Sequence, residues 1–254
     1  MPYADSHGTR IHYIVDGKGP PLLLHHGLSG SFESWKDYGY VDALKPDYRL
    51  ILIDARGHGR SDKPHDPELY GPEHRVGDVT TVLDDLEIES AHFFGYSYGG
   101  RVGLELAKFC PERVLSMIIG GFGPRVQDPD KPSPVLKTLT SGTQGLLAEY
   151  ERYGHVPPQM RKRVLSNDMD ALTAIMLADR PSLEDDLPNM TIPFLVFIGE
   201  NDRLYPHNLV KESFKKASNG TVVSLPGLDH SQCILKRRVV LPHIRDFLER
   251  TLDS

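Results

Sequence analysis

The sequence predicts an α/β fold in which a mostly parallel central sheet carries helices on both faces. Apolar runs of strand length recur along the chain, and stretches with helical apolar spacing separate most of them. The expected buried strands are residues 21–25, 48–53, 91–94, 114–119, 193–198 and 221–225. The expected helices are residues 35–44, 73–86, 99–109, 206–217 and 235–252. Strands that alternate with helices in this way form parallel sheets joined by right-handed crossovers.

A strand of another kind is expected near the N-terminus. Polar and apolar residues alternate over residues 9–15, which is typical of an antiparallel strand with one face in solvent. Asp16 and Gly17 follow as a turn signal. We therefore expect this strand at an edge of the sheet.

One long segment breaks the alternation of strands and helices. Residues 122–189 contain no convincing strand, many prolines and several helical patterns, of which residues 145–153 and 168–177 are examples. Because compact domains seldom carry a structureless loop of this length, we expect a small helical cap inserted into the fold. Residues 1–121 and 190–254 then form the core, and residues 122–189 form the cap or lid. The alternative is a surface insertion without a role in function, since loops tolerate insertions well.

Composition and charge limit the classes of function. The chain has 254 residues, of which 39% are hydrophobic and 25% charged, and this suits one large domain or a domain with an insertion. The formal net charge of -6 is spread without long blocks, so no nucleic-acid partner is expected. The N-terminus has neither a basic start nor an apolar core, and no apolar run approaches membrane-spanning length. We expect a cytoplasmic monomer or homodimer that has a small-molecule substrate and no membrane partner.

Cysteine and histidine spacing gives no sign of a metal centre. Cys110 and Cys233 are too few for a disulfide framework and lack metal-ligand spacing. The adjacent His25 and His26 could suggest a metal site, but no spaced carboxylate or third histidine accompanies them. No metal and no cofactor are therefore expected.

The most informative motif is residues 95–99, with the sequence Gly-Tyr-Ser-Tyr-Gly, directly after an apolar run. A serine between two glycines at this place is typical of a tight turn from strand to helix that exposes the serine hydroxyl. Gly99, Gly103 and Ala107 then recur at every fourth position, so the helix can approach the sheet closely. The helix N-terminus favours an oxyanion beside it. Ser97 is the candidate nucleophile; the alternative is a loop serine without chemistry.

A serine hydroxyl is a weak nucleophile near neutral pH, so it needs a histidine within hydrogen-bond reach and a carboxylate that orients the histidine. Ligands of open α/β sheets bind at the carboxyl ends of strands, which limits the search to residues just after strands. Among twelve histidines, His230 fits best, because it follows the strand expected at 221–225 and precedes the last helix. His155 lies in the expected cap, and His207 and His243 belong to helices, where surface or packing roles are expected.

The acid is also expected directly after a strand. Asp202 follows the apolar run at residues 193–198 and is our choice, with Glu200 in the same loop as the alternative. Asp229 is next to His230 in the sequence, and adjacent residues seldom orient each other's side chains. The predicted order along the chain is nucleophile, acid, base.

An oxyanion hole needs two backbone amides, one from the residue after the nucleophile and one from a loop after an earlier strand. Tyr98 supplies the first amide. The second is expected from Leu28, in the His-His-Gly-Leu segment at residues 25–28 that follows the first buried strand.

Taken together, these motifs resemble the α/β-hydrolase family over the whole chain except the cap. The His-Gly oxyanion motif, the Asp-Ala-Arg-Gly-His-Gly-Arg-Ser segment at residues 54–61, the serine turn, the aspartate loop and the late histidine occur in the family's order. The resemblance implies Ser97 as nucleophile, Asp202 as acid and His230 as base. It also implies that residues 54–61 form a structural turn and not a catalytic element.

The identity of the nucleophile narrows the reaction that the resemblance implies. Haloalkane dehalogenases and epoxide hydrolases of this fold use aspartate at the turn, so Ser97 argues against both. Acyl chemistry remains, and a carboxylesterase for esters of small or medium acyl chain is the leading hypothesis. The alternatives are a carbon-carbon bond hydrolase of ring-cleavage products, a haloperoxidase-like perhydrolase, and a receptor-like protein of this fold that binds a ligand with little turnover.

Overall fold

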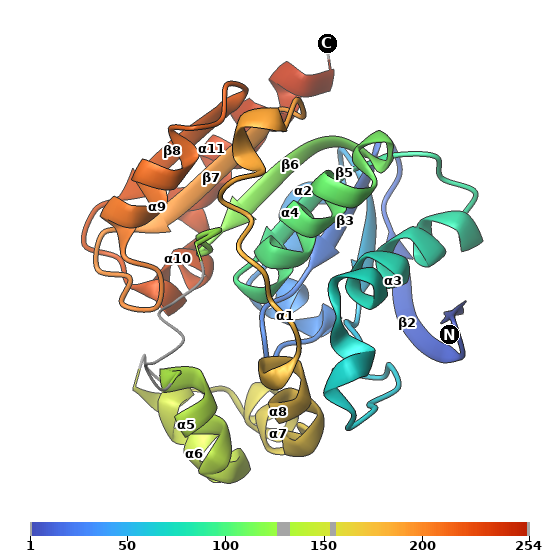
Figure 1. Cartoon of the computed structure of the whole chain (residues 1–254), viewed down its shortest axis with the longest axis vertical. Helices are drawn as coiled ribbons and strands as arrows, with labels where there is room; N and C mark the ends of the chain where they lie inside the picture. The colour runs from blue at the N-terminus through green and yellow to red at the C-terminus, as the bar shows by residue number, and fades with distance from the viewer. Residues whose placement is uncertain (1, 126–132, 153–155, 253–254) are drawn as a thin grey trace.

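An eight-stranded sheet forms the centre of the protein in a computed structural model that describes residues 2–125, 133–152 and 156–252 (Figure 1). The strand order is β1-β2-β4-β3-β5-β6-β7-β8, with β3 to β8 parallel and β1 and β2 antiparallel to their neighbours. The strands are β1 (Tyr3–Ser6), β2 (Thr9–Asp16), β3 (Pro21–His25), β4 (Arg49–Ile53), β5 (Ala91–Tyr96), β6 (Val114–Gly120), β7 (Phe194–Gly199) and β8 (Gly220–Leu225). The predicted fold class, a mostly parallel sheet with helices, is confirmed.

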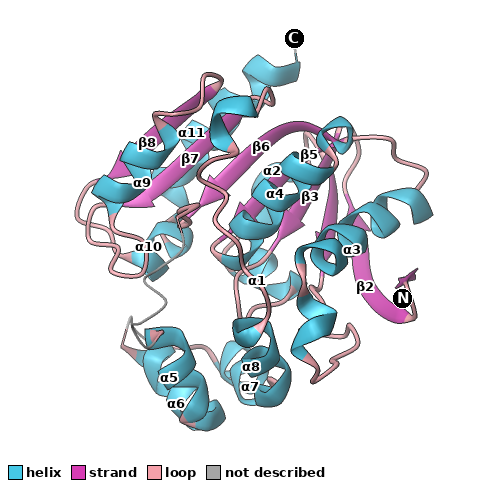
Figure 2. Cartoon of the chain, in the orientation of Figure 1, coloured by secondary structure: helices cyan, strands magenta, loops and turns pink. Residues whose placement is uncertain are grey.

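Helices cover both faces of the sheet (Figure 2). They are α1 (Phe32–Asp37), α2 (Tyr40–Leu44), α3 (Pro72–Asp85), α4 (Tyr98–Phe109), α9 (His207–Phe214), α10 (His230–Leu235) and α11 (Arg237–Leu252). Short 3-10 helices occur at η1 (Pro67–Tyr70), η2 (Pro111–Arg113) and η3 (Leu187–Asn189). Successive residues of a strand point to opposite faces, so Phe93 packs with α3 and α4 while Phe94 packs with α1 and α2. The two apolar cores hold the carboxyl ends of the strands in fixed positions.

The N-terminal strand prediction was right about direction and wrong about place. Strand β2 is antiparallel to β4, as expected, but β1 pairs along its other side, with Ala4 opposite Ile11. The edge strand is therefore β1. Its four residues are too few to show an alternating pattern in the sequence, and His7 and Gly8, both with positive φ, make the connecting turn.

Two helical segments are divided differently from the prediction. The helix expected at residues 35–44 is split into α1 and α2, because Gly39 adopts φ 75° and interrupts the helical backbone. At the C-terminus, α11 begins at Arg237 and the shorter α10 precedes it, with His230 as its first residue. His230, which was expected between the last strand and the last helix, thus lies at the N-terminus of a short helix of its own.

In the described residues between β6 and β7, four further α-helices group together at one end of the sheet (Figure 1). They are α5 (Pro134–Thr140), α6 (Gly142–Glu151), α7 (Pro158–Leu165) and α8 (Met169–Leu177). Helices α6 and α8 occupy the stretches with the two expected helical patterns, although residue 153 is outside the described residues. We call α5 to α8 the cap helices; the division into a core and a cap at residues 122 and 189 stays a prediction. In the described part of the chain, no helix combines the length and apolar character that a membrane crossing needs.

Candidate active site

Ser97 lies at a sharp turn between β5 and α4. Its backbone has φ 52° and ψ -108°, a combination that residues with a Cβ atom rarely adopt, and its amide donates a hydrogen bond to the oxygen of Gly120 at 2.7 Å. The flanking glycines are required by space. A Cβ atom on Gly95 would lie 2.2 Å from the oxygen of Gly99, and one on Gly99 would lie 2.1 Å from the oxygen of His25. The turn therefore requires glycine on both sides of the serine.

Three side chains from separate parts of the chain form one hydrogen-bonded relay. The Nε2 atom of His230 is 3.1 Å from Oγ of Ser97, and its Nδ1 atom is 2.8 Å from Oδ2 of Asp202. The Asp202 side chain is fully buried, and that of His230 is 15% exposed. Because the carboxylate accepts a hydrogen bond from the Nδ1–H group, the Nε2 lone pair is directed at the serine hydroxyl. The structure thus brings together the three residues that the sequence singled out.

Backbone amides hold the carboxylate of Asp202 in place. Its Oδ1 atom accepts hydrogen bonds from the amides of Leu204 and Tyr205, each at 2.9 Å, which leaves Oδ2 to His230. Glu200, the alternative acid, is exposed to solvent. A carboxylate with its second oxygen saturated in this way has one position available for the histidine.

Hydrogen bonds also position the backbone of His230 and of the residue before it. Asp229 caps α10, because its side chain accepts a hydrogen bond from the backbone amide of Gln232 at 2.8 Å. In return, the side-chain oxygen of Gln232 accepts a hydrogen bond from the backbone amide of Asp229. The hydroxyl of Tyr96 donates a hydrogen bond to the backbone oxygen of His230. The spacing of Asp229 and Gln232 is that of a capping box and could have indicated the first role, whereas the role of Tyr96 has no local signal in the sequence. Asp229 is therefore a capping residue and does not orient the ring.

The other histidines considered from the sequence are not part of the relay. His207 begins α9, and His243 is an exposed residue of α11. His155 lies outside the described residues.

The two residues whose amides are expected to form an oxyanion hole line the same cavity as the relay. Leu28, Tyr98, Ser97 and His230 all line this cavity. Within the described part of the chain, neither the Leu28 amide nor the Tyr98 amide donates a hydrogen bond to another residue. Tyr98 is the first residue of α4, where the positive end of the helix dipole adds to the attraction for an anion.

Buried histidines fix the loop that contains Leu28, a role that sequence analysis missed. The Nε2 atom of His26 accepts the amide of Ala55 at 3.1 Å, and Nε2 of His58 accepts the amide of Ser29 at 3.1 Å. An imidazole nitrogen that accepts a hydrogen bond carries no proton, so both rings are neutral. Burial is the main reason that the pKa of both rings lies below the usual value. The same effect, with His26 beside it, lowers the pKa of His25 to about 3. These rings brace the loop through hydrogen bonds to its backbone.

Residues 54–61 form a support beneath this loop. The buried carboxylate of Asp54 accepts hydrogen bonds from the amides of Phe32 at 2.8 Å and Arg60 at 3.0 Å, and it is 2.9 Å from Nδ1 of His12. Burial alone would raise the pKa of Asp54. The hydrogen bond with His12, the nearby His26 and the two amides lower it by more, so the pKa of this carboxyl lies below its ordinary value. These contacts fit the structural role that the family resemblance implied.

The relay opens into a large cavity between the core and the cap helices, with a volume of about 1220 Å³. Apolar side chains from both sides line it, including Trp35, Phe122, Leu139, Leu146, Ile175 and Ile234. The cap also contacts the Leu28 loop directly. The hydroxyl of Tyr150 lies 3.0 Å from Oγ of Ser29, and Asn167 donates to the backbone oxygen of Ser29 at 3.2 Å. Substrates of drug size fit within such a space.

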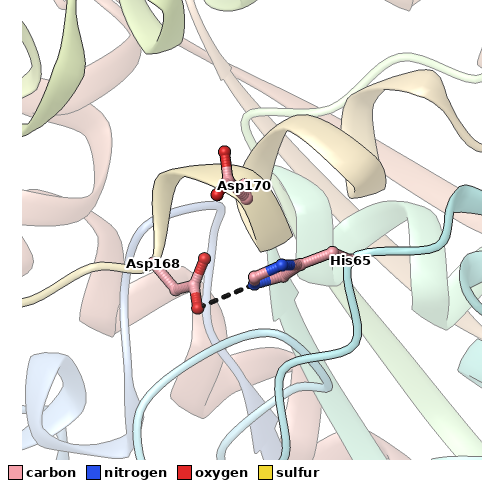
Figure 3. A group of neighbouring side chains, drawn as sticks. All are labelled: His65, Asp168 and Asp170. Carbon is pink, nitrogen blue, oxygen red and sulfur yellow. Dashed lines mark hydrogen bonds and ion pairs between the residues drawn. The ribbon is translucent and has the colours of Figure 1, made fainter.

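A second cluster of polar side chains joins the core to the cap. His65, Asp168 and Asp170 place one ligand atom each within 4.8 Å of one another, so the group has donor atoms that a metal ion could use (Figure 3). The carboxylate of Asp168, however, already forms hydrogen bonds with the His65 ring and with the backbone amide of Ala171, both at 3.0 Å. Through the second bond it caps α8. The His65 side chain is 55% exposed. These contacts give the cluster a structural role.

Comparison with known proteins agrees with the fold. Residues 20–134 match the family described as alpha/beta hydrolase fold. A putative 2-succinyl-6-hydroxy-2,4-cyclohexadiene-1-carboxylate synthase from Bacillus subtilis (strain 168) is 25% identical over 94% of this chain and 95% of its own length. A non-heme chloroperoxidase from Streptomyces lividans is 28% identical over 96% of this chain and 98% of its own length. The crystal structure of the enol-lactonase from Burkholderia xenovorans LB400 has a TM-score of 0.84 at 25% identity, covering 98% of this chain and 100% of that one.

The sheet topology, the matched family and the full-length structural likeness lead to one conclusion. The chain has the α/β-hydrolase fold, and its residues 20–134 match the model of the family with that fold. The resemblance drawn from the sequence is confirmed at this level.

Proposed function

We propose that the protein is a serine hydrolase that cleaves carboxylic esters of small or medium acyl chain through an acyl-enzyme on Ser97. The observation that carries the proposal is the relay from Asp202 through His230 to Ser97, with hydrogen-bond distances of 2.8 and 3.1 Å. This arrangement serves to remove a proton from a serine hydroxyl during its attack on a carbonyl.

In the first half of the reaction, Nε2 of His230 accepts the proton of the Ser97 hydroxyl while Oγ bonds to the ester carbonyl carbon. The carbonyl π electrons move to the oxygen, and the amides of Leu28 and Tyr98 bind the resulting oxyanion. The buried carboxylate of Asp202 stabilises the imidazolium that forms. His230 then gives its proton to the alcohol oxygen as the carbon-oxygen bond breaks, and an acyl group remains on Ser97.

In the second half, a water molecule enters the place that the alcohol has left. His230 accepts a proton from this water as its oxygen attacks the acyl carbon, and the Leu28 and Tyr98 amides again bind the oxyanion. The bond to Oγ breaks, and the proton returns from His230 to Ser97. The carboxylic acid leaves and the serine hydroxyl is restored.

The cavity supports an organic ester as substrate. Its walls are largely apolar, and the cap helices close one side of it. Apolar walls bind an acyl chain by removing its surface from water, at about 25 cal/mol per Å². We propose a lid role for the cap, and we keep the expected cytoplasmic location and the monomeric or dimeric state as predictions.

Two relatives of this chain have names that do not denote ester cleavage, a putative 2-succinyl-6-hydroxy-2,4-cyclohexadiene-1-carboxylate synthase and a non-heme chloroperoxidase. Carbon-carbon bond hydrolysis and peracid chemistry are therefore kept as the alternatives that share this relay. The enol-lactonase, an enzyme named for a lactone, favours ester cleavage and covers 98% of this chain. Steady turnover would separate all three from a receptor-like protein.

The test is hydrolysis of 4-nitrophenyl esters with acyl chains from acetyl to decanoyl, beside a ring-cleavage dienoate and a peracid assay. The proposal expects multiple turnovers on the esters, with the highest kcat/KM at a small or medium chain. It also expects loss of this activity in Ser97→Ala. Turnover of the dienoate or formation of peracid, without ester hydrolysis, would assign the site to the corresponding alternative.

A further inference from the structure

An arginine without a carboxylate partner lies in the candidate active-site cavity. Arg180 follows α8, in the segment that returns from the cap to the core, and lines the same cavity as Ser97 and His230. Its guanidinium donates to the backbone oxygen of Met176 at 2.7 Å and contacts the sulfur of Met176 at 3.4 Å. Among the described residues, no carboxylate forms an ion pair with it.

A buried carboxylate that contacts Arg101 of the cavity wall is already shared by two arginines. Glu105 is fully buried and accepts hydrogen bonds from Arg75 at 2.6 and 2.5 Å and from Arg101 at 3.2 Å. Arg101 lines the cavity beside Arg180. Arg75 and Arg101 therefore share one carboxylate, and Arg180, which is repelled by both, adds a third guanidinium group without a carboxylate of its own.

This third charge is energetically unfavourable in the free protein. Burial lowers the pKa of Arg180, and repulsion from Arg101 and Arg75 lowers it further, while only tyrosines act in the opposite direction. A guanidinium keeps its proton even so. A half-buried charge without a counter-ion is uncommon unless a ligand supplies one.

The other acidic residues of the cavity wall do not supply this counter-ion. Asp37 pairs with Arg163, Glu149 pairs with Arg152, and Asp179 is exposed. Among the described residues, the charge on Arg180 is thus left without a counter-ion on the wall of the cavity.

A series of aromatic contacts connects the arginines to the proposed base. The rings of His230 and Tyr205 are 5.9 Å apart, those of Tyr205 and Phe122 are 5.1 Å apart, and the guanidinium of Arg101 lies 5.4 Å from the centre of the Phe122 ring. A ligand at the arginines would therefore lie in the same compartment as the reacting ester group.

We propose that Arg180, with Arg101 beside it, binds an ionised carboxylate on the substrate, so that the preferred substrate is a carboxylic ester bearing a second, free carboxylate. This inference rests on the proposed ester hydrolysis. The planar guanidinium suits a carboxylate because two parallel hydrogen bonds form between them.

The chain offers a matched control. Arg125 also lines the cavity, but it holds Glu184 with two hydrogen bonds, at 2.8 and 2.9 Å. Its charge is already compensated. Substitution of Arg125 should therefore leave the recognition of an anionic substrate unchanged.

The kinetic experiment compares 4-nitrophenyl monoesters of adipic, pimelic and suberic acid with the neutral hexanoyl, heptanoyl and octanoyl esters of equal length. We expect kcat/KM at least about tenfold higher for one monoester than for its neutral counterpart, the effect of one charge-assisted hydrogen-bonded pair. Arg180→Gln should remove this preference and change the neutral ester by less than about threefold. Arg180→Lys should keep part of the preference for the monoester, and Arg125→Gln should keep all of this preference.

The neutral ester reports on folding and on the proposed function at once. If the wild type hydrolyses both kinds of ester equally well, and Arg180→Gln affects both equally, the inference is overturned and the proposed function stands. If no ester is hydrolysed, the proposed function fails, and binding decides the inference. Calorimetric titration with adipate, pimelate and suberate should then show binding about tenfold weaker in Arg180→Gln than in the wild type. Equal affinity, or no binding to the wild type, would overturn it.

Discussion

The Oδ2 atom of Asp202 lies 2.8 Å from Nδ1 of His230, although the two residues follow different strands and are 28 positions apart in the sequence. This contact fixes which imidazole nitrogen carries the proton. It leaves Nε2 as an acceptor 3.1 Å from Ser97. The relationship depends on the parallel sheet, which brings the ends of β5, β7 and β8 to one edge.

The first prediction concerns the choice of acid. Asp202→Asn should lower kcat for ester hydrolysis by about 10³-fold or more, because the amide would donate to Nδ1 and place the proton on the wrong nitrogen. Glu200→Gln should change kcat by less than about twofold, since Glu200 is exposed. Steady-state kinetics of both variants on one ester measure this difference. The reverse ranking would move the acid to Glu200.

The second prediction uses the backbone of the serine turn. Ser97→Gly should raise the melting temperature by about 2–4 °C, because glycine adopts φ 52° without steric strain. In a chain of this size, this shift corresponds to about 1 kcal/mol in the free energy of unfolding. Ser97→Ala keeps the Cβ atom and should melt within about 1 °C of the wild type. Differential scanning calorimetry compares the three proteins. A lower melting temperature in Ser97→Gly would show that the turn is not strained.

The third prediction concerns Glu184, which joins the segment after the cap to the core. Hydrogen bonds from Arg125, Lys216 and Ser213 lower its pKa to about 2 despite partial burial. A depressed pKa contributes stability above the pKa of the unfolded chain, and this contribution disappears as the pH falls through the folded value. Glu184→Gln should thus lower the free energy of unfolding by about 2 kcal/mol between pH 5 and 7.

The same substitution provides its own control in acid. The difference between wild type and Glu184→Gln should shrink below about pH 4 and vanish near pH 2, where both side chains are neutral. Urea unfolding at a series of pH values measures it. A difference that is constant with pH would show that Glu184 acts through packing and not through its charge.

The fourth prediction tests the contact between the cap and the Leu28 loop. Tyr150→Phe removes the hydroxyl that lies 3.0 Å from Oγ of Ser29. We expect KM for the longest ester accepted to rise about three- to tenfold, as loss of one hydrogen bond implies, while labelling by a small phosphonate changes little. If the rate of phosphonate labelling falls by the same factor as KM rises, the contact supports the relay itself and not substrate binding.

Local patterns in the sequence predicted the elements that carry the relay. The buried runs of β5 and β7 and the glycines around Ser97 are recognisable because each depends on residues within a few positions. The position of Asp202 followed from the end of a strand. Spacing left Asp202 and Glu200 open as the acid; in the structure Asp202 contacts His230, and its role as acid stays a proposal.

Features that depend on distant packing could not be predicted in this way. The short β1 shows no pattern of its own, and the break at Gly39 requires a positive φ that the sequence does not reveal. The support from His26 and His58 depends on hydrogen bonds across the fold. The isolated charge of Arg180 becomes visible only when Arg75 and Arg101 are seen to share Glu105.

Covalent labelling examines the first step of the proposed mechanism, which requires that Ser97 alone reacts as the nucleophile. The wild-type protein is treated with a fluorophosphonate, and the intact mass and the modified peptide are determined by mass spectrometry. We expect one adduct per chain, on Ser97, with labelling abolished in Ser97→Ala and slowed in Asp202→Asn. An adduct on another residue, or undiminished labelling of Ser97→Ala, would contradict this step of the mechanism.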